Sequence, residues 1–310
     1  MRTVNQRTTE APANSLANRN RTVRIGQVVL PYAVITPAML LIAVFTFYPT
    51  FYMIYVSFFE YNFFSMKFVG LRNYYQLFFI NIDFWHALKN TAIYTVLATL
   101  CVLGLATVFA VYLQKSTVVN GIAQRLMFLP YLCSGVTIAM VWSWLMDTEG
   151  LLNVVLNFFN LPALRWLNDS ATSLMSVIIV SIWKSLGYYA LIMLSSVKSI
   201  PTELLEAAEL DDAGKLRTFF KIQLPILSPQ LFFLGITITM NSFKVFDIVR
   251  LMTGGGPGNS SDVLVYYIYR QAMEYNRYGL GCAAGVVLMI FLGILSIFYF
   301  KIMAKRVHYQ

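Results

Sequence analysis

Five of the chain's 14 acidic residues fall within ten positions of one polar segment, which lies between two long apolar runs. These residues are Glu203, Glu206, Glu209, Asp211 and Asp212. Ala207 and Ala208 lie among them, and side chains this small let a partner's backbone approach closely. The segment is therefore either a docking surface for another protein or a solvated interfacial helix with a charged face.

Residue types that perform catalysis or bind metals are scarce. The only histidines are His86 and His308, and neither a nucleophile constellation nor metal-ligand spacing accompanies them. The three cysteines, Cys101, Cys133 and Cys282, are odd in number, widely spaced and surrounded by apolar residues. We expect them to be small buried hydrophobic residues, because neither a disulfide framework nor a metal site fits this pattern. The sequence predicts no catalytic residues and no metal.

Six apolar runs separate the polar segments. Of the 310 residues, 58% are hydrophobic and 12% are charged, about half the charged share of an ordinary globular domain. The runs are Val28–Phe58, Thr91–Leu113, Leu126–Met146, Leu174–Val197, Ile226–Val249 and Leu280–Phe300. Each is near the ~20 residues that cross a bilayer as a helix, the structure that satisfies backbone hydrogen bonds in lipid. The predicted fold class is all-α: a polytopic membrane protein with six transmembrane helices.

The net charge of +9 is distributed unevenly about these runs. If six helices alternate, about twice as many Lys and Arg residues lie on the side of the termini as on the opposite side. This bias predicts that both termini are cytoplasmic, and it explains the basic residues without a nucleic-acid partner. Residues 1–27 are expected to form a cytoplasmic tail, since Pro12 and scattered Asn residues weaken the amphipathic helix of a mitochondrial presequence.

A glycine-rich stretch, Thr253-Gly254-Gly255-Gly256-Pro257-Gly258, lies between the fifth and sixth runs. It lacks the spacing and the lysine of a Walker A nucleotide-binding loop, and no Walker B pattern is present in the chain. Glycines beside a proline are typical of a tight, fixed turn, which we expect where the chain leaves the membrane on the outer side.

The stretch from Glu206 to Pro225 resembles the EAA loop of ABC importer permeases, whose pattern is Glu-Ala-Ala, three residues, Gly, and later Ile-x-Leu-Pro. The residues that match in register are Glu206, Ala207, Ala208, Ile222, Leu224 and Pro225, with Asp211 and Ala213 matching the longer form of the sugar-permease branch. Asp212 replaces the usual glycine, and Asp adopts a left-handed turn only at some cost. Gly214, two residues on, can take over that turn.

Three further segments are similar to carbohydrate-uptake permeases related to the maltose and glycerol-phosphate systems. They are residues 68–74 in the first outer loop, residues 84–91 at the entry to the second span, and Phe246-Asp247 followed by residues 253–257. The resemblance implies the type I importer permease fold. It also implies a tail at 1–27, a transmembrane permease domain at 28–310 with an ABC core at about 86–303, and a coupling loop at 199–225.

The resemblance implies one of two different permease subunits that together form the path of an ATP-driven importer. An external binding protein would deliver a sugar or related solute, such as an oligosaccharide, a polyol or a glycerol-phosphate compound. The chain would be no enzyme and would bind no cofactor: ATP and Mg would bind a separate pair of ATPase subunits, which grip the loop. Further implied are contact with membrane lipid and a prokaryotic plasma membrane location.

Candidates for lining the solute path are polar and aromatic residues within the predicted spans: Trp183, Lys184, Tyr188, Tyr189, Asn241, Ser242, Lys244 and Asp247. Ionisable groups are costly in lipid and usually face a cavity or a partner. Lys244 and Asp247 are three residues apart, so on a continuous helix they would share a face and pair. The candidates either line the path, where aromatic and hydrogen-bonding groups suit a sugar, or pack against the partner permease.

Two other classes of protein remain as alternatives. A secondary transporter or channel working alone usually has inverted repeats and intramembrane acids. No convincing repeat is visible here, and Asp247 is the only acid well inside a predicted span. A membrane enzyme is the other alternative, and the scarcity of catalytic residues argues against it.

Overall fold

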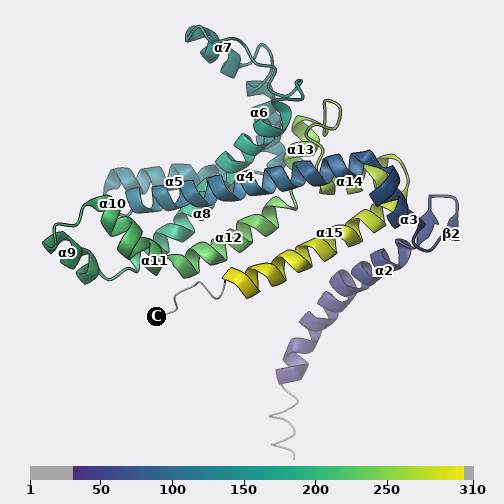
Figure 1. The fold of residues 1–310 in the computed structure, drawn as a ribbon, viewed down its shortest axis with the longest axis horizontal. Helices are drawn as coiled ribbons and strands as arrows, with labels where there is room; N and C mark the ends of the chain where they lie inside the picture. The colour runs from purple at the N-terminus through teal and green to yellow at the C-terminus, as the bar shows by residue number, and fades with distance from the viewer. Residues whose placement is uncertain (1–30, 304–310) are drawn as a thin grey trace, which may run out of the picture. The chain divides into compact units, whose positions relative to one another are not determined.

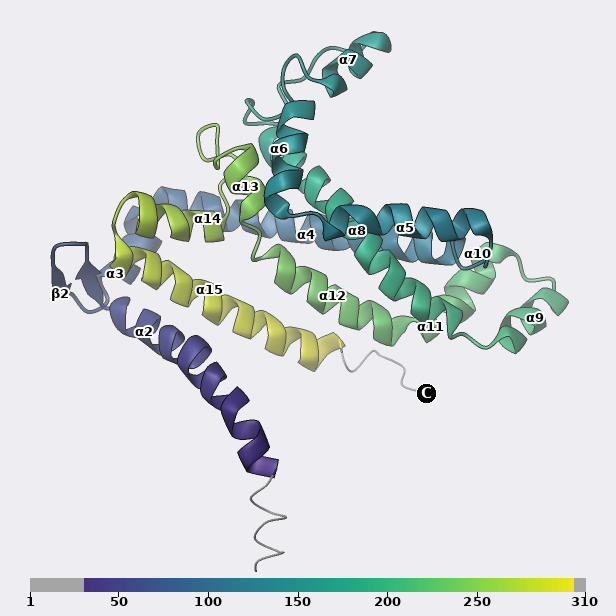
Figure 2. The same cartoon turned by 180° about the vertical axis from the view of Figure 1, so that it is seen from behind.

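Helices of varied length make up most of the described part of the chain (Figures 1 and 2). The computed structural model describes residues 31–303, so the tail expected at 1–27 and His308 lie outside the described residues. The chain divides after Tyr55 into two compact units, which are described separately.

The described part of the first unit is a single apolar helix. This helix runs over Pro31–Val56 and contains the π-helical turn η1 (Ala43–Phe47) and α2 (Tyr48–Val56). Two of its hydroxyl groups bond within the helix: Thr36 Oγ1 donates to the Tyr32 carbonyl at 2.6 Å, and Thr50 Oγ1 donates to the Thr46 carbonyl at 2.7 Å. The predicted first span, Val28–Phe58, corresponds to this helix over the described residues.

The second unit begins with a short hairpin and continues as packed helices. Its elements are β1 (Phe59–Tyr61), β2 (Met66–Phe68), α3 (Arg72–Tyr75), η2 (Gln76–Ile80), α4 (Ile82–Tyr112), α5 (Val118–Leu132), α6 (Gly135–Leu145), α7 (Leu151–Phe158), α8 (Ser173–Lys198), α9 (Thr202–Leu210), α10 (Lys215–Thr218), η3 (Phe219–Gln223), α11 (Leu224–Ile226), α12 (Ser228–Ser242), α13 (Asp247–Met252), α14 (Leu264–Tyr269), η4 (Arg270–Glu274), α15 (Tyr278–Phe298) and η5 (Tyr299–Met303). The two strands pair antiparallel, with Phe59 opposite Phe68. This hairpin is the only sheet in the described part of an otherwise helical chain.

Helix α4 is central to the second unit. It packs against α8 and α12, while α5 packs against α8 and α14 packs against α15. Helices α9, α10 and α11 lie at one end of this unit, and β2 with α3 lies at the other end (Figures 1 and 2). Helices α6 and α7 project sideways from the bundle (Figures 1 and 2).

Four helices are long and apolar enough to cross a membrane: Pro31–Val56, Ile82–Tyr112, Ser173–Lys198 and Tyr278–Lys301. Two bent pairs pass the same test together, Val118–Leu132 with Gly135–Leu145 and Lys215–Ile226 with Ser228–Ser242. Counting each pair as one span gives the predicted six. The prediction of a continuous helix is wrong for both Leu126–Met146, which contains the 101° bend, and Ile226–Val249, which begins at the 71° bend and is interrupted after Ser242.

The break between α5 and α6 has a local cause. Pro130 lies inside the last turn of α5 and has no backbone N–H to donate. Cys133 is extended, with φ −75° and ψ 144°, and Ser134 then caps the new helix by accepting a hydrogen bond from the Val136 amide at 3.2 Å. A proline followed by a capping serine therefore ends one helix and starts another in a new direction.

The second break lies between two prolines. Pro225 follows the π-helical turn η3, and Pro229 occupies the first turn of α12. Helix α12 then stops at Ser242, and Phe246, with φ −144°, separates it from the short helix α13. The chain therefore changes direction twice within the segment predicted as one straight span.

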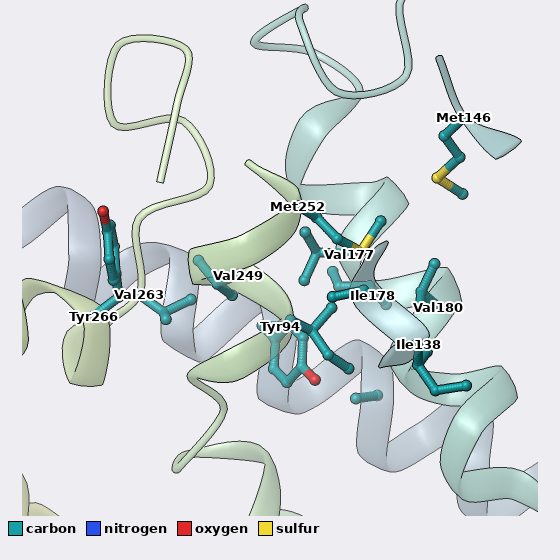
Figure 3. Packing of buried hydrophobic residues seen from close by; sticks show 13 residues of the cluster. Tyr94, Ile138, Met146, Val177, Ile178, Val180, Val249, Met252, Val263 and Tyr266 are labelled. Atoms are coloured by element: carbon teal, nitrogen blue, oxygen red, sulfur yellow. The ribbon is translucent and has the colours of Figure 1, made fainter. Parts of the chain in front are cut away.

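Buried apolar side chains from α4, α6, α8 and α13 form one of the cores of the second unit (Figure 3). Tyr94, Ile178 and Val249 come from three different helices and meet in its centre (Figure 3). Hydroxyl groups in these helices donate to carbonyls one turn back, as Thr91 Oγ1 does to the Ala87 carbonyl at 2.7 Å. Such bonds satisfy polar groups that have no water partner in a bilayer.

Helices α5 and α8 approach most closely at Gly187. A Cβ atom added there would lie 1.8 Å from the carbonyl oxygen of Met127 in α5. Small residues at membrane helix interfaces permit this kind of backbone contact. The contact holds α5 against α8 directly before the break.

Candidate docking loop and solute path

The acidic loop (residues 199–225) lies at the end of the bundle opposite the hairpin, where α9 stands away from the long helices (Figures 1 and 2). Glu206 and Ala207 are exposed on α9. Ala208 is buried, and its carbonyl accepts a hydrogen bond from the Ala213 amide at 2.9 Å. Of the two predicted alanines, only Ala207 is therefore open to a partner.

The turn after α9 uses the residue that replaces the family's glycine. Asp212 has φ +52°, in the left-handed region, whereas Gly214 has φ −59°. Gly214 therefore does not take over the turn. Asp is among the few residues besides glycine that adopt this conformation, because its short polar side chain can bond locally.

Replacing Asp212 with glycine should stabilise the loop, because glycine has no Cβ to clash at positive φ. We expect the free energy of unfolding to rise by up to about 1 kcal/mol, seen as a higher midpoint in thermal unfolding of the purified protein. Gly214→Ala is the matched control and should be tolerated, since an added Cβ meets nothing within 4 Å. Destabilisation by Asp212→Gly would contradict the assigned turn.

The second half of the loop returns the chain to the bundle. Residues from both halves line a cavity of about 410 Å³: Ala208, Asp211, Ala213, Arg217, Thr218, Lys221 and Ile222. Pro225 is exposed in α11, while Leu224 is half-buried. Sequence reasoning missed three exposed apolar side chains in this loop, Leu210, Leu216 and Phe220, of which Leu210 is 89% exposed. The sequence signal for such an exposed surface was Leu210, an apolar residue at the end of the otherwise charged helix α9.

Tyrosines from two helices meet beside the break between α5 and α6. Tyr131 of α5 stacks on Tyr188 of α8, with ring centroids 4.2 Å apart. The ring of Tyr189 lies 5.0 Å from that of Tyr188, and its hydroxyl accepts a hydrogen bond from Asn241 Nδ2 at 3.1 Å. The middle of α8 is thereby joined to the end of α12.

Charged and aromatic residues lie on the other side of the same break. Trp142 of α6 packs edge-on against Trp183 of α8, with centroids 5.2 Å apart. A Cβ atom added to Gly135 would lie 3.2 Å from Asp247 Oδ2 and 3.6 Å from Lys184 Nζ. The structure therefore brings α6, α8 and the start of α13 together around a glycine.

The two groups of side chains are neighbours. Lys184 and Tyr188 are four residues apart on α8 and share a face, and their respective contacts Gly135 and Tyr131 are also four residues apart. We call the combined set the break cluster: Tyr131, Gly135, Trp142, Trp183, Lys184, Tyr188, Tyr189, Asn241 and Asp247. Six of the eight predicted path residues belong to it. Tyr131, Gly135 and Trp142 were missed, although Pro130 and Gly135 in an apolar run signalled a helix break.

The remaining two predicted path residues, Ser242 and Lys244, follow Asn241 in the chain and are not counted in the break cluster. The predicted Lys244–Asp247 ion pair is wrong, because α12 ends at Ser242 and the two residues do not share a helix. Within residues 31–303, no ion pair within 4.0 Å includes either of them. Lys244 is exposed in the connection, and Ser242 is buried in its own chain.

The predicted tight turn is present in the glycine loop (residues 253–262). Gly254, Gly255 and Gly258 have positive φ angles, and the Gly256–Pro257 peptide is cis. Thr253 Oγ1 donates to the Val249 carbonyl at 3.0 Å and accepts from Ser261 Oγ at 2.8 Å. Side-chain and backbone hydrogen bonds therefore close the loop on itself.

A polar network joins the glycine loop to α4. Asn259 Nδ2 donates to Asp83 Oδ1 at 2.9 Å, and its Oδ1 accepts from Arg270 at 2.8 Å. Arg270 also pairs with the buried Asp262 at 2.5 Å. The Asn90 side chain donates to the carbonyls of Asn259 and Asp262 at 3.0 and 2.9 Å. The loop is held in one position against the start of α4.

Burial raises the pKa of Asp262 to about 7, although the Arg270 guanidinium acts to lower it. The folded chain consequently keeps a proton that the unfolded chain releases near pH 4. This group should make the free energy of unfolding fall by about 1.4 kcal/mol per pH unit as the pH rises between about 4 and 7. Asp262→Asn should remove that contribution, measured as the difference between wild-type and variant unfolding free energies across this range. A constant difference would contradict the shift.

Comparison with known proteins identifies the family of this helical bundle. Residues 103–309 match the family described as binding-protein-dependent transport system inner membrane component. The chain belongs to this family. It is the permease subunit of an ABC importer and a multi-pass protein of the inner membrane.

Relatives match the permease over most of its length. The probable ABC transporter permease protein YurN of Bacillus subtilis is 34% identical over 281 residues, 88% of this chain and 95% of the relative. The arabinooligosaccharides transport system permease protein AraP of Halalkalibacterium halodurans is 33% identical, covering 88% and 87%. The sn-glycerol-3-phosphate transport system permease protein UgpA of Agrobacterium fabrum is 31% identical, covering 91% and 97%.

Solved structures share the fold. A chain of a bacterial ABC transporter that imports the acidic polysaccharide alginate matches with a TM-score of 0.81 at 23% identity, over 92% of this permease and 99% of that chain. A chain from the alginate transporter in complex with its pentasaccharide-bound periplasmic protein matches with a TM-score of 0.80 at 22% identity, over 89% and 94%. The type I importer permease fold predicted from the sequence is confirmed.

Proposed function

We propose that this permease forms, with a second and different permease, the translocation path for a sugar or related solute delivered by an external binding protein. The observation that carries the proposal is the acidic loop, which lies at one end of the bundle with Glu206 and Ala207 exposed on α9. Five carboxylates and the accessible Ala207 form a surface that another protein can bind, and an ATPase subunit is the partner proposed here.

The acidic loop transmits movement from the ATPase subunits to the transmembrane helices. ATP with Mg binds to a separate pair of ATPase subunits, whose closure displaces Glu206 and Ala207. Because α10, η3 and α11 connect α9 to α12, the displacement reaches the transmembrane helices. Nucleotide binding then biases a two-state equilibrium between inward-open and outward-open arrangements. The loop, residues 199–225, and both termini are cytoplasmic in this proposal, and the glycine loop is external.

The solute path is assigned to the break cluster. Lys184 and Tyr188 lie near the middle of α8, so they are near the middle of a membrane-spanning helix. Lys184 and Asp247 are ionisable groups at membrane depth, and such groups usually face a water-filled path or a partner. Two relatives are named for the transport of arabinooligosaccharides and of sn-glycerol 3-phosphate, which supports a hydroxylated solute.

Co-purification tests the proposal. The permease is expressed with the second permease and the ATPase subunits encoded beside it, and the tagged permease is isolated in detergent. We expect a stable complex whose ATP hydrolysis is stimulated by the loaded binding protein. Solute transport by the permease alone in liposomes, without an ATPase subunit, would overturn the assignment.

A further inference from the structure

Gly135 lies close to two opposite charges. Asp247 Oδ2 and Lys184 Nζ both lie within 4 Å of the point where a Cβ atom of residue 135 would be. Among the described residues, the two groups nevertheless form no ion pair within 4.0 Å. The amine of Lys184 and the carboxylate of Asp247 therefore lie close to the same glycine without bonding to each other.

A hydroxyl group fits this arrangement. A single oxygen atom can lie at about 2.7–3.2 Å from both groups, accepting a hydrogen bond from the ammonium and donating its own hydrogen to the carboxylate. Resting on the proposed function, we propose that Lys184 and Asp247 bind one hydroxyl of an uncharged polyhydroxylated solute beside Gly135, and that Asp247 excludes phosphate monoesters and sulfonates from this path.

The surroundings match the same class of solute. Trp183 is 42% exposed and forms an edge-on pair with Trp142, so part of its ring is open to a ligand. Tyr131 is also exposed beside the break, and Asn241 offers an amide next to Tyr189. Open rings provide flat apolar surfaces for sugar C–H groups, while the amide bonds to hydroxyls.

An anionic group would be poorly accommodated at this point. The oxygens of a fully ionised phosphate monoester or of a sulfonate accept hydrogen bonds but cannot donate to Asp247. A carboxylate that repels one class of ligand while it bonds to another is a means of specificity. Lys244 adds a positive charge to this segment. The three atoms nearest to a Cβ added at Gly135 nevertheless belong to Asp247 and Lys184, and none belongs to Lys244. The charge beside Lys184 is therefore that of Asp247.

The test measures binding to the whole importer complex in nanodiscs by titration calorimetry, at one ionic strength. The uncharged probes are arabinotriose and maltotriose, and the anionic probes are sn-glycerol 3-phosphate and glucose 6-phosphate. We expect at least one uncharged probe to bind about tenfold more tightly than either anion, the factor that one charge-assisted hydrogen bond supplies. Lys184→Gln should weaken the uncharged probe by about tenfold.

Two variants test the proposed geometry. Asp247→Asn should lose most of the preference for the uncharged probe, because Lys184 is then left without a neighbouring negative charge. Gly135→Ala should weaken the uncharged probe, because the added methyl carbon would lie 3.2 Å from Asp247 Oδ2 and 3.6 Å from Lys184 Nζ and would hinder a hydroxyl that bonds to both groups. The matched control is Glu149→Gln, which removes one negative charge from an exposed residue outside the break cluster and should keep the wild-type preference.

Several results would overturn the inference. These are no binding of any uncharged probe, equal or tighter binding of an anion, or an unchanged preference in Asp247→Asn. If the complex assembles and its ATP hydrolysis responds to the binding protein, these results leave the proposed function intact. A permease that does not assemble with ATPase subunits overturns both.

Discussion

Replacing Glu206 with lysine, or Ala207 with arginine, is expected to reduce solute uptake at least tenfold while the purified complex still hydrolyses ATP. Both residues are exposed on α9, at the end of the bundle where the ATPase subunit is proposed to bind. A bulky or oppositely charged side chain there removes the differential contact through which nucleotide binding moves the helices. A loss of about 1.4 kcal/mol of coupling free energy corresponds to the expected tenfold reduction in solute uptake.

The measurement compares uptake and ATP hydrolysis in proteoliposomes that contain the complete importer. Glu149→Lys is the matched control, since it makes the same change of charge on an exposed residue outside the acidic loop. Uptake by the control should equal that of the wild type. Full uptake and normal assembly in Glu206→Lys and Ala207→Arg would remove the coupling role from the acidic loop.

Long uninterrupted helices were predictable from the sequence. Leu174–Val197 and Leu280–Phe300 differ from the observed Ser173–Lys198 and Tyr278–Lys301 by at most a few residues. Hydropathy depends on composition, which is uniform along these segments. The two bends were not predictable in this way, because Pro130 and Ser134 change the backbone direction without lowering the apolar content of the run.

The two candidate sites also differ in how far the sequence could predict them. The acidic loop is local, so its residues and even the unusual role of Asp212 could be considered from the sequence. The break cluster depends on contacts between helices. The neighbours of Asp247 are Gly135 and Lys184, which are more than 60 positions away. Pairing Lys244 with Asp247 assumed a continuous helix, and the interruption after Ser242 invalidates that assumption.

Replacing Gly187 with alanine should have the largest effect on folding. The added methyl carbon would lie 1.8 Å from the Met127 carbonyl oxygen and 2.3 Å from its carbon, both in the backbone of α5. Neither helix can relieve this clash by changing a side-chain rotamer, so α5 and α8 must separate. Overpacking usually costs about 1–3 kcal/mol, and a backbone clash belongs at or above the upper end of that range.

Gly121→Ala provides the matched control for this clash. Gly121 lies in α5, and an added Cβ there meets nothing within 4 Å. Alanine favours a helix interior by about 0.5–1 kcal/mol over glycine, so this variant should be as stable as the wild type or more so. Thermal unfolding and size-exclusion chromatography in detergent compare the two variants. Because the break cluster depends on α5 and α8 remaining in contact, Gly187→Ala should also lose solute binding. If the Gly187→Ala protein were monodisperse and had the wild-type unfolding midpoint, the two helices would not meet at this glycine.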